Sequence, residues 1–224
     1  MLNSYRAVLF DLDGTLVDHS NAARAGVIAW SRELGIFPDP ARWLALEQQW
    51  FLAYEHGKLT HSGQRAARVR EYLHEPKLSE TAALQLFNGF LHQYIASMQP
   101  FSDAAEVLEQ CFDCGQLVGI ATNGAASLQT TKLRTTGLWD DRLIMLAAVE
   151  MEAAKPNPEF YARALDIVGT SPADTVMVGD SLPNDVLAPI AAGIAAIHVD
   201  HVGTGTADPR YPTIRDLSEL LSAP

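Results

Sequence analysis

Basic side chains are scarce in this sequence, and their scarcity excludes one class of partner. The 224 residues include 16 Lys and Arg against 27 Asp and Glu, which gives a formal net charge of −11. A nucleic-acid-binding protein is expected to carry a basic stripe, and none appears, so we do not expect nucleic acid as a partner. An anionic ligand could still bind, but only through a local positive site such as a metal ion.

Cysteine is scarce as well, and the two that are present do not predict redox or metal chemistry. Cys111 and Cys114 have the spacing of a redox pair, but AAEVLEQCFDC predicts a helix that ends at Gly115. Both thiols would then lie near the helix C-terminus, whereas redox pairs use a helix N-terminus to lower the thiol pKa. A zinc site would need further ligands at matching spacing, and none is nearby. We expect both cysteines to serve packing.

Long apolar runs are missing too. No run approaches the roughly 20 residues that a membrane-spanning helix needs, so we expect no membrane partner. The first residues, MLNSYRAVLFDLD, contain one Arg and soon reach acidic residues, which is not the pattern of a signal peptide. We therefore expect a cytoplasmic protein. Hydrophobic residues make up 48% of the chain, which is ample for a globular core.

From about residue 102 onward, short apolar runs alternate with helical patterns. The predicted strands are AVLFDLD at the front and residues 117–122, 142–149, 174–180 and 194–200, and the predicted helices are residues 103–114, 127–137, 157–169 and 183–193. Five strands separated by helices predict an α/β fold with a doubly wound, Rossmann-like parallel sheet. Continuous apolar runs are typical of parallel strands that are buried on both faces.

Residues 16–100 show a different pattern, with no strand-like run and many aromatic residues. Apolar side chains recur at three- and four-residue steps in WLALEQQWFLAYEHG and in TAALQLFNGFLHQYIASM, which predicts two amphipathic helices. The residues expected on one face are Trp43, Leu46, Trp50 and Tyr54 in the first helix and Leu84, Phe87, Leu91 and Ile95 in the second. Because the segment is too long for a loop, we expect an inserted all-helical domain at 16–100 and a core formed by residues 1–15 and 101–224.

Polar residues stand at the ends of four of the predicted strands or just beyond them. They are Asp11 and Asp13, then Thr122-Asn123-Gly124, then Lys155-Pro156, and finally Gly179-Asp180-Ser181 with Asp185. Ligands of open α/β sheets bind at the C-terminal ends of the strands. Four polar groups in sequence order at that one edge therefore predict a functional site.

These residues carry a family resemblance. Asp-Leu-Asp-Gly-Thr-Leu, Thr-Asn-Gly, Lys-Pro and Gly-Asp-Ser with the later Asp185 resemble the four motifs of the haloacid dehalogenase (HAD-like) hydrolase superfamily. The helical insertion directly after the first motif is similar to the C1 cap of the phosphatase branch. The resemblance covers nearly the whole chain, and four motifs in order at suitable spacing are highly specific.

The resemblance implies a role for each motif residue. Asp11 would be the nucleophile that attacks phosphorus and forms an aspartyl-phosphate. Asp13 would be the general acid for the leaving oxygen and then the base for water. Thr122 and the amide of Asn123 would hold the phosphoryl oxygens, and Lys155 would neutralise charge on Asp11 and on the phosphoryl group.

The resemblance also implies Mg²⁺ as the cofactor. Its ligands would be Asp11, the main-chain carbonyl of Asp13 and Asp180, with Asp185 as a supporting or direct ligand. In a strand, residues i and i+2 point the same way, so Asp11 and Asp13 would repel each other without a nearby positive charge. Mg²⁺ prefers oxygen ligands, and it would both offset this repulsion and orient a phosphate dianion.

Each motif also has a purely structural explanation. The first could be a turn with an Asx cap, and residues 122–124 could be an ordinary strand-to-helix turn. Lys155 could be a solvated lysine, and Asp185 could stand in the first turn of its helix because the helix dipole favours it there. The four motifs together favour the functional interpretation.

Hydrolysis of a phosphomonoester is the expected activity, and other activities stay open. A dehalogenase is disfavoured, because dehalogenases lack an acid at the position of Asp13 and need no metal. A phosphomutase of the β-phosphoglucomutase type shares all four motifs. A catalytically silent phosphate-binding or regulatory module should have lost Asp11, Asp13, Lys155 or Asp180, and all four are present.

The helical segment says little about the substrate. Arg65, Arg68 and Arg70 could grip a second anionic group, but a solvated helix face paired with Glu71 is favoured. Thr-Asn-Gly and the cap layout resemble nucleotidase-like members, which suggests a nucleoside monophosphate or a similar small phosphorylated metabolite. The histidines suggest no pairing, and we expect a monomer or a homodimer.

Overall fold

The computed structural model describes residues 1–203 and 208–221. The chain divides into two compact units: Met1–Asp18 with Pro100–Pro224, named the core unit, and His19–Gln99, named the helical unit. The boundaries predicted from the sequence follow residues 15 and 100. Within the described residues, no helix combines the length and the apolar character needed to cross a membrane.

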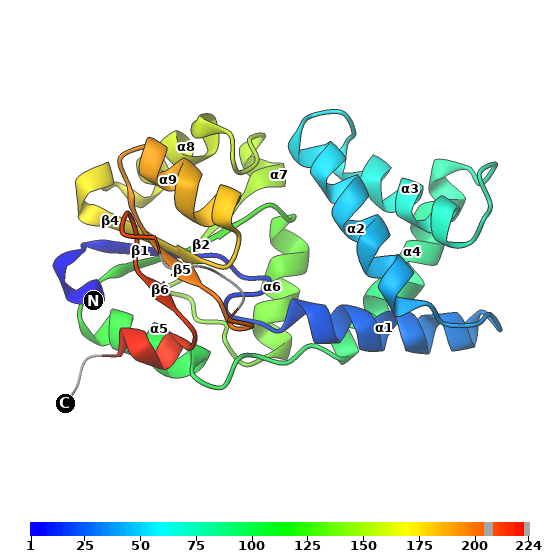
Figure 1. Ribbon diagram of the computed structural model, residues 1–224, viewed down its shortest axis with the longest axis horizontal. Coiled ribbons are helices and arrows are strands. Elements are labelled where there is room, and N and C mark those ends of the chain that lie inside the picture. The colour runs from blue at the N-terminus through cyan, green and yellow to red at the C-terminus, as the bar shows by residue number, and fades with distance from the viewer. Residues whose placement is uncertain (204–207, 222–224) are drawn as a thin grey trace. The chain divides into compact units, whose positions relative to one another are not determined.

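The core unit contains a six-stranded sheet in which every pair of neighbours is parallel (Figure 1). The strands are β1 (Ala7–Phe10), β2 (Leu117–Thr122), β3 (Ile144–Ala147), β4 (Thr175–Gly179), β5 (Ala195–Val199) and β6 (Thr213–Ile214). Their order is β3-β2-β1-β4-β5-β6, so the chain builds outward from β1 to one edge and then returns beside β1 with β4. The predicted doubly wound parallel sheet is confirmed, and its topological switch point lies between β1 and β4.

Helices cover both faces of this sheet, and Figure 1 shows α8 and α9 on one face with α5 on the other. The helices are α5 (Ala104–Asp113), α6 (Ala126–Thr135), α7 (Ala148–Met151), α8 (Pro158–Val168) and α9 (Ala188–Ala191), with a π-helix η3 (Leu182–Leu187) and 3-10 turns η1 (Leu2–Ser4), η2 (Pro172–Asp174) and η4 (Leu217–Leu220). Cys111 of α5 is buried, Cys114 is exposed, and both are free thiols.

Helix α8 shows how local sequence and packing agree. The Asn157 side chain caps its first turn by accepting a hydrogen bond from the Glu159 amide, and Gly169 ends it in the left-handed conformation. Its apolar face buries Phe160 and Tyr161 completely, in a cluster that also contains Leu9 of β1 and side chains of β2 and β3. Burying a side chain of this size stabilises the fold by roughly 1.5–3 kcal/mol.

Three details of the core unit differ from the prediction. The predicted strand 142–149 is shorter, because the chain turns into α7 at Ala148. The predicted helix 183–193 is divided into η3 and α9. A sixth strand, β6, was not predicted, because it has only two residues and Thr213 is exposed, which leaves no apolar run to mark it.

The helical unit consists of four helices, α1 (His19–Glu33), α2 (Pro40–Glu55), α3 (His61–Tyr72) and α4 (Glu80–Ala96). Three of them begin at a side-chain cap that accepts a backbone N–H: Asp39 before α2, Thr60 before α3 and Ser79 before α4. Its core is aromatic, with Trp43 in contact with Phe90 (4.5 Å between ring centroids) and with Trp30 (5.3 Å).

The buried face of α4 shares Phe87 with the predicted face and otherwise differs from it. The buried residues are Ala83, Phe87, Phe90 and Tyr94, and the predicted Leu84, Leu91 and Ile95 are half-buried. Helix α4 packs against both α1 and α3, so the aromatic side chains occupy the middle of the contact. Gly26 of α1 makes this approach close, because a Cβ there would lie 2.8 Å from the Tyr94 Cα.

Candidate active site

Polar side chains from four loops meet at the carboxyl ends of the strands, beside the switch point between β1 and β4. Lys155, which precedes α8, places its Nζ 2.8 Å from Asp11 Oδ1 and 2.6 Å from Asp185 Oδ1. The same Nζ donates to the Ala121 carbonyl of β2 at 2.8 Å. One ammonium group therefore contacts Asp11 after β1, the Ala121 carbonyl near the end of β2, and Asp185 beyond β4.

Lys155 is 2% exposed, and its backbone is held as firmly as its side chain. Its N–H donates to Asn123 Oδ1 at 2.7 Å, and its carbonyl accepts from Asn123 Nδ2 at 2.8 Å. Burial by itself would lower the pKa of the Lys155 ammonium, but the charges of Asp11 and Asp185 outweigh burial and hold that pKa above its ordinary value. Lys155 therefore stays charged. The anchoring role of the Asn123 side chain was not predicted.

Three carboxylates form a cluster around this ammonium. Asp11, Asp180 and Asp185 each offer an oxygen, and these oxygens lie within 4.8 Å of one another. Burial raises the pKa of Asp11 to about 7, with Lys155 acting in the opposite direction and Asp185 adding to the rise. Asp180 is more exposed than Asp11, but partial desolvation, reinforced by the charge of Asp11, also raises the pKa of Asp180 to about 7. One lysine thus does not fully offset the negative charge of the cluster.

This donor set fits a hard divalent cation, because every ligand is an oxygen and the carboxylates still repel one another. Asp11 and Asp180 are the side chains best able to hold it. Both oxygens of Asp185 are already engaged, Oδ1 with Lys155 and Oδ2 with the Ser181 amide at 3.0 Å, which suits a supporting role. The main-chain carbonyl of Asp13 stays a prediction.

Glycine is required at position 14, where the loop after β1 passes the loop after β4. Gly14 has φ +95°, and a Cβ at this position would collide with the carboxylate of Asp180. Both the backbone angle and the lack of space exclude a side chain. The turn after β1 can therefore bring Asp11 close to Asp180.

Asp13 lies in a different environment from the carboxylate cluster. Its oxygens are 2.6 Å and 2.5 Å from Lys132 Nζ, and Oδ2 is 3.2 Å from Gln129 Nε2. Its side chain is 28% exposed, whereas that of Asp11 is 11% exposed. The two acids therefore have different surroundings, and their catalytic roles stay predictions.

Thr122 ends β2 beside these groups. Its Oγ1 accepts hydrogen bonds from the Gly124 amide at 3.1 Å and from Gln129 Nε2 at 2.5 Å. Gln129 and Lys132 lie on α6, and neither was predicted as a site residue. No local signal marks them, because a lysine and a glutamine on a helix are ordinarily solvated.

A family model for haloacid dehalogenase-like hydrolases matches residues 5–193. The chain belongs to this family. The predicted family and the predicted hydrolase class are therefore confirmed.

Known proteins similar to this HAD-like hydrolase include phosphatases and dehalogenases. The ribulose-1,5-bisphosphate 5-phosphatase of Halopiger xanaduensis is 28% identical over 87% of this chain and 84% of its own. The HAD-hydrolase YfnB of Bacillus subtilis, crystallised with magnesium, has a TM-score of 0.85 at 24% identity, with 96% of each chain covered. The L-2-haloacid dehalogenase Rha0230 has a TM-score of 0.77 at 21% identity, with 96% and 93% covered. At these identities the two structures show the fold alone.

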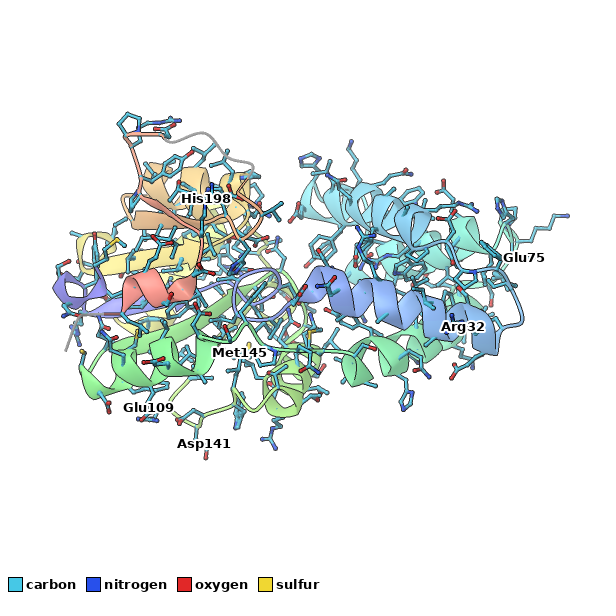
Figure 2. The ribbon with its side chains drawn as sticks, turned by 60° about the horizontal axis from the view of Figure 1, so that its bottom comes forward. Arg32, Glu75, Glu109, Asp141, Met145 and His198 are labelled. Atoms are coloured by element: carbon cyan, nitrogen blue, oxygen red, sulfur yellow. The ribbon has the colours of Figure 1, made fainter. Side chains whose placement is uncertain are left out.

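Two further residues of the HAD-like site were not predicted. Thr15 is fully buried, and its Oγ1 accepts from the Asp180 amide at 3.1 Å, which ties the loop after β1 to the loop after β4. His198 of β5, labelled in Figure 2, has its Nε2 3.1 Å from the Asp180 carbonyl. The position of Asp180 is thus set by contacts from the loop after β1 and from β5.

The favoured prediction for the arginines of α3 is wrong for Arg68. Its side chain is buried and does not pair with Glu71. It donates to Glu47 Oε1 at 2.5 Å and to Gln64 Oε1 at 3.0 Å. Glu47 Oε2 also lies 3.1 Å from His19 Nε2, so a partly buried polar network joins α1, α2 and α3 within the helical unit.

Proposed function

We propose that this chain is a Mg²⁺-dependent phosphomonoester hydrolase that acts on a small phosphorylated metabolite through an aspartyl-phosphate. The observation that carries the proposal is the pair of unlike acids on one loop. Asp11 is buried against Lys155, and Asp13 is more exposed and paired with Lys132. The phosphatase relatives support the hydrolase assignment, and the oxygen cluster of Asp11, Asp180 and Asp185 supports the Mg²⁺ dependence.

In the first step a carboxylate oxygen of Asp11 attacks phosphorus. A bond forms between that oxygen and phosphorus, the bond from phosphorus to the ester oxygen breaks, and Asp13 gives its proton to the leaving oxygen. In the second step Asp13 takes a proton from water, and the water oxygen bonds to phosphorus. The bond between Asp11 and phosphorus then breaks, which releases inorganic phosphate and restores Asp11.

Neighbouring groups stabilise the charge that develops on the phosphoryl oxygens. Lys155 holds a fixed positive charge 2.8 Å from Asp11, so it also lies near the atom that is attacked. Thr122 and the amide of Asn123 stand at the end of β2 and would donate to the phosphoryl oxygens. When bound by Asp11, Asp180 and the carbonyl of Asp13, with Asp185 in support, Mg²⁺ would supply charge stabilisation to the phosphoryl group.

The remaining features of the proposal follow from the sequence and the relatives. The named substrates of the curated relatives are small phosphorylated metabolites, among them phosphoglycolate, glyceraldehyde 3-phosphate and phosphoserine. A nucleoside monophosphate remains within this substrate class. We propose that the helical unit is a C1 cap, that the enzyme acts in the cytoplasm as a monomer or a homodimer, and that neither nucleic acid nor a membrane is its partner.

Dehalogenation is the second candidate, because solved 2-haloacid dehalogenases share the fold. An alkoxide leaving group needs a proton, whereas a halide does not. The acid Asp13, held in place by Lys132, therefore favours a phosphoester substrate.

Both candidates can be tested with the purified chain. Phosphate release should be measured from p-nitrophenyl phosphate and from a panel of sugar phosphates, carboxylic-acid phosphates and nucleoside monophosphates, with Mg²⁺ and after EDTA. Halide release from 2-haloacids should be measured in parallel, with D11N as the inactive control. We expect phosphate release that EDTA abolishes and Mg²⁺ restores. Halide release without phosphate release would overturn the proposal in favour of a dehalogenase.

A further inference from the structure

Helix α6 directs two side chains, one turn apart, at the active-site loops. Gln129 is 1% exposed and Lys132 is 3% exposed, so both are buried although their types are ordinarily found at the surface. Lys132 binds Asp13, and Gln129 contacts both Asp13 and Thr122. A helix that only covered the sheet would place apolar side chains at these positions.

Lys132 holds the Asp13 carboxylate at two points. Its Nζ lies 2.6 Å from Oδ1 and 2.5 Å from Oδ2, so rotation of the carboxyl group about the Cβ–Cγ bond is restricted. This torsion is otherwise broad, and an aspartate side chain that is 28% exposed could turn toward water. The contact therefore selects one orientation of a carboxylate that would otherwise have several.

Gln129 connects this pair to Thr122 in a defined direction. A hydroxyl has two acceptor sites and one hydrogen, and Thr122 Oγ1 already accepts from the Gly124 amide and from Gln129 Nε2. The Thr122 hydrogen is therefore left to donate elsewhere, as a phosphoryl oxygen requires. The amide orientation follows from Asp13, because an ionised carboxylate only accepts and Gln129 Nε2 lies 3.2 Å from its Oδ2.

We propose that Lys132 is a positioning residue for Asp13, and that Gln129 couples this pair to the phosphoryl-binding hydroxyl of Thr122. The inference rests on the proposed phosphatase function. Lys132 acts through Asp13, whose two carboxyl oxygens it contacts. It keeps the Asp13 carboxyl group in the orientation in which the protonated form donates to the ester oxygen in the first step and the carboxylate accepts a proton from water in the second.

The two steps depend on Asp13 to different degrees, and this difference makes the proposal testable. p-Nitrophenolate leaves without a proton, so the first step with p-nitrophenyl phosphate does not need a positioned acid. Breakdown of the aspartyl-phosphate always needs the base. A variant with a poorly positioned Asp13 should therefore release one equivalent of p-nitrophenolate rapidly and then turn over slowly.

The experiment compares K132M with K132R and with R134M under stopped flow with Mg²⁺ and p-nitrophenyl phosphate. Arg134 is an exposed residue of the same helix, so R134M removes the same charge without touching the site. For K132M we expect a burst of one equivalent per enzyme and a steady-state kcat lower by about 10–100-fold. K132R, which can still bind both carboxylate oxygens, should recover most of kcat, and R134M should behave as wild type.

Several outcomes would overturn the proposal. A K132M variant that raises KM and leaves kcat unchanged would show that Lys132 binds substrate instead. A loss of kcat without a burst would show that Lys132 acts on the first step, through Asp11 or the phosphoryl group. Unchanged kinetics would show that it has no role in turnover.

Crystal structures of wild type and K132M give a readout that does not depend on activity. We expect the Asp13 carboxylate to leave its wild-type orientation in K132M and to keep it in K132R. If wild type releases no phosphate from any ester, the proposed function fails, and an unmoved Asp13 in K132M would still refute the positioning role. If K132M does not fold, the crystal structures of wild type and K132R are compared instead. An Asp13 carboxylate that residue 132 does not contact in either structure would refute the positioning role.

Discussion

Lys155 Nζ lies 2.8 Å from Asp11 Oδ1, although 144 positions separate the two residues in the sequence. The ammonium is buried and is shared with Asp185 at 2.6 Å. Buried charges are tolerated only when they are paired and hydrogen-bonded, so this contact joins the loops and balances charge on Asp11 and Asp185.

Lys155→Met should damage stability and activity together. The substitution leaves Asp11 and Asp185 buried without their cation, which should lower the free energy of unfolding by about 3 kcal/mol. Phosphate release should fall by roughly 10²–10³-fold, because a charge contact in the transition state is lost. Urea unfolding and steady-state kinetics measure the two effects. Exposed Lys77 supplies the control K77M, and a stability loss no larger than that of K77M would contradict the prediction.

Asp11 should make the metal-free protein less stable as the pH rises. Its pKa is about 7 in the fold against an ordinary value of 3.8, so the native state binds this proton more tightly than the unfolded chain does. The free energy of unfolding should therefore decrease as the pH rises from about 4 to above 7. D11N should be folded and inactive, and its stability should depend less on pH in this window. Equal slopes for wild type and D11N, measured by urea unfolding with EDTA, would refute this assignment.

Gly14→Ala should disturb the loop after β1 more than backbone strain alone predicts. Gly115 has a similar left-handed φ of +71° with nothing within 4 Å, so G115A isolates the cost of strain, about 1 kcal/mol. G14A adds a collision with the Asp180 carboxylate, and it should cost at least about 1 kcal/mol more. It should also weaken Mg²⁺ binding, as measured by calorimetry. Similar losses for G14A and G115A would show that the loop yields without disturbing Asp180.

Glu47→Gln should destabilise the helical unit. Burial by itself would raise the pKa of Glu47, but the charges of Arg68 and His19 outweigh it and hold the pKa well below its ordinary value of 4.5. The carboxylate thus stabilises the fold above pH 4.5, and this contribution is lost as the pH falls below that value. Near pH 7 we expect E47Q to lower the free energy of unfolding by roughly 3 kcal/mol, because buried Arg68 loses its partner.

The measurement is urea unfolding followed by tryptophan fluorescence, since Trp30 and Trp43 lie in the core of the helical unit. E75Q is the control, because Glu75 is an exposed residue of the same unit (Figure 2). The gap between E47Q and wild type should narrow as the pH falls below 4.5. A gap that is independent of pH would show that the carboxylate charge is not what stabilises Arg68.

Local sequence determined much of this protein. Continuous apolar runs predicted five of the six strands, and caps and glycines marked most helix ends in the core unit. The members of the acidic site could be predicted because parallel strands bring their carboxyl ends to one edge, so residues that follow β1, β2 and β4 must meet there. The family motifs then suggested a role for Asp11, Asp13, Lys155 and Asp180.

Only the tertiary structure decided which charged residues are buried and which side chains they contact. Lys132 and Arg68 look like solvated helix residues in the sequence, and their partners, Asp13 and Glu47, lie 119 and 21 positions away. Local patterns reflect periodicity and turn chemistry, whereas the partner of a buried charge depends on how distant segments pack. The same reason explains why α4 buries Phe90 and Tyr94, since contacts with two neighbouring helices select its inner face.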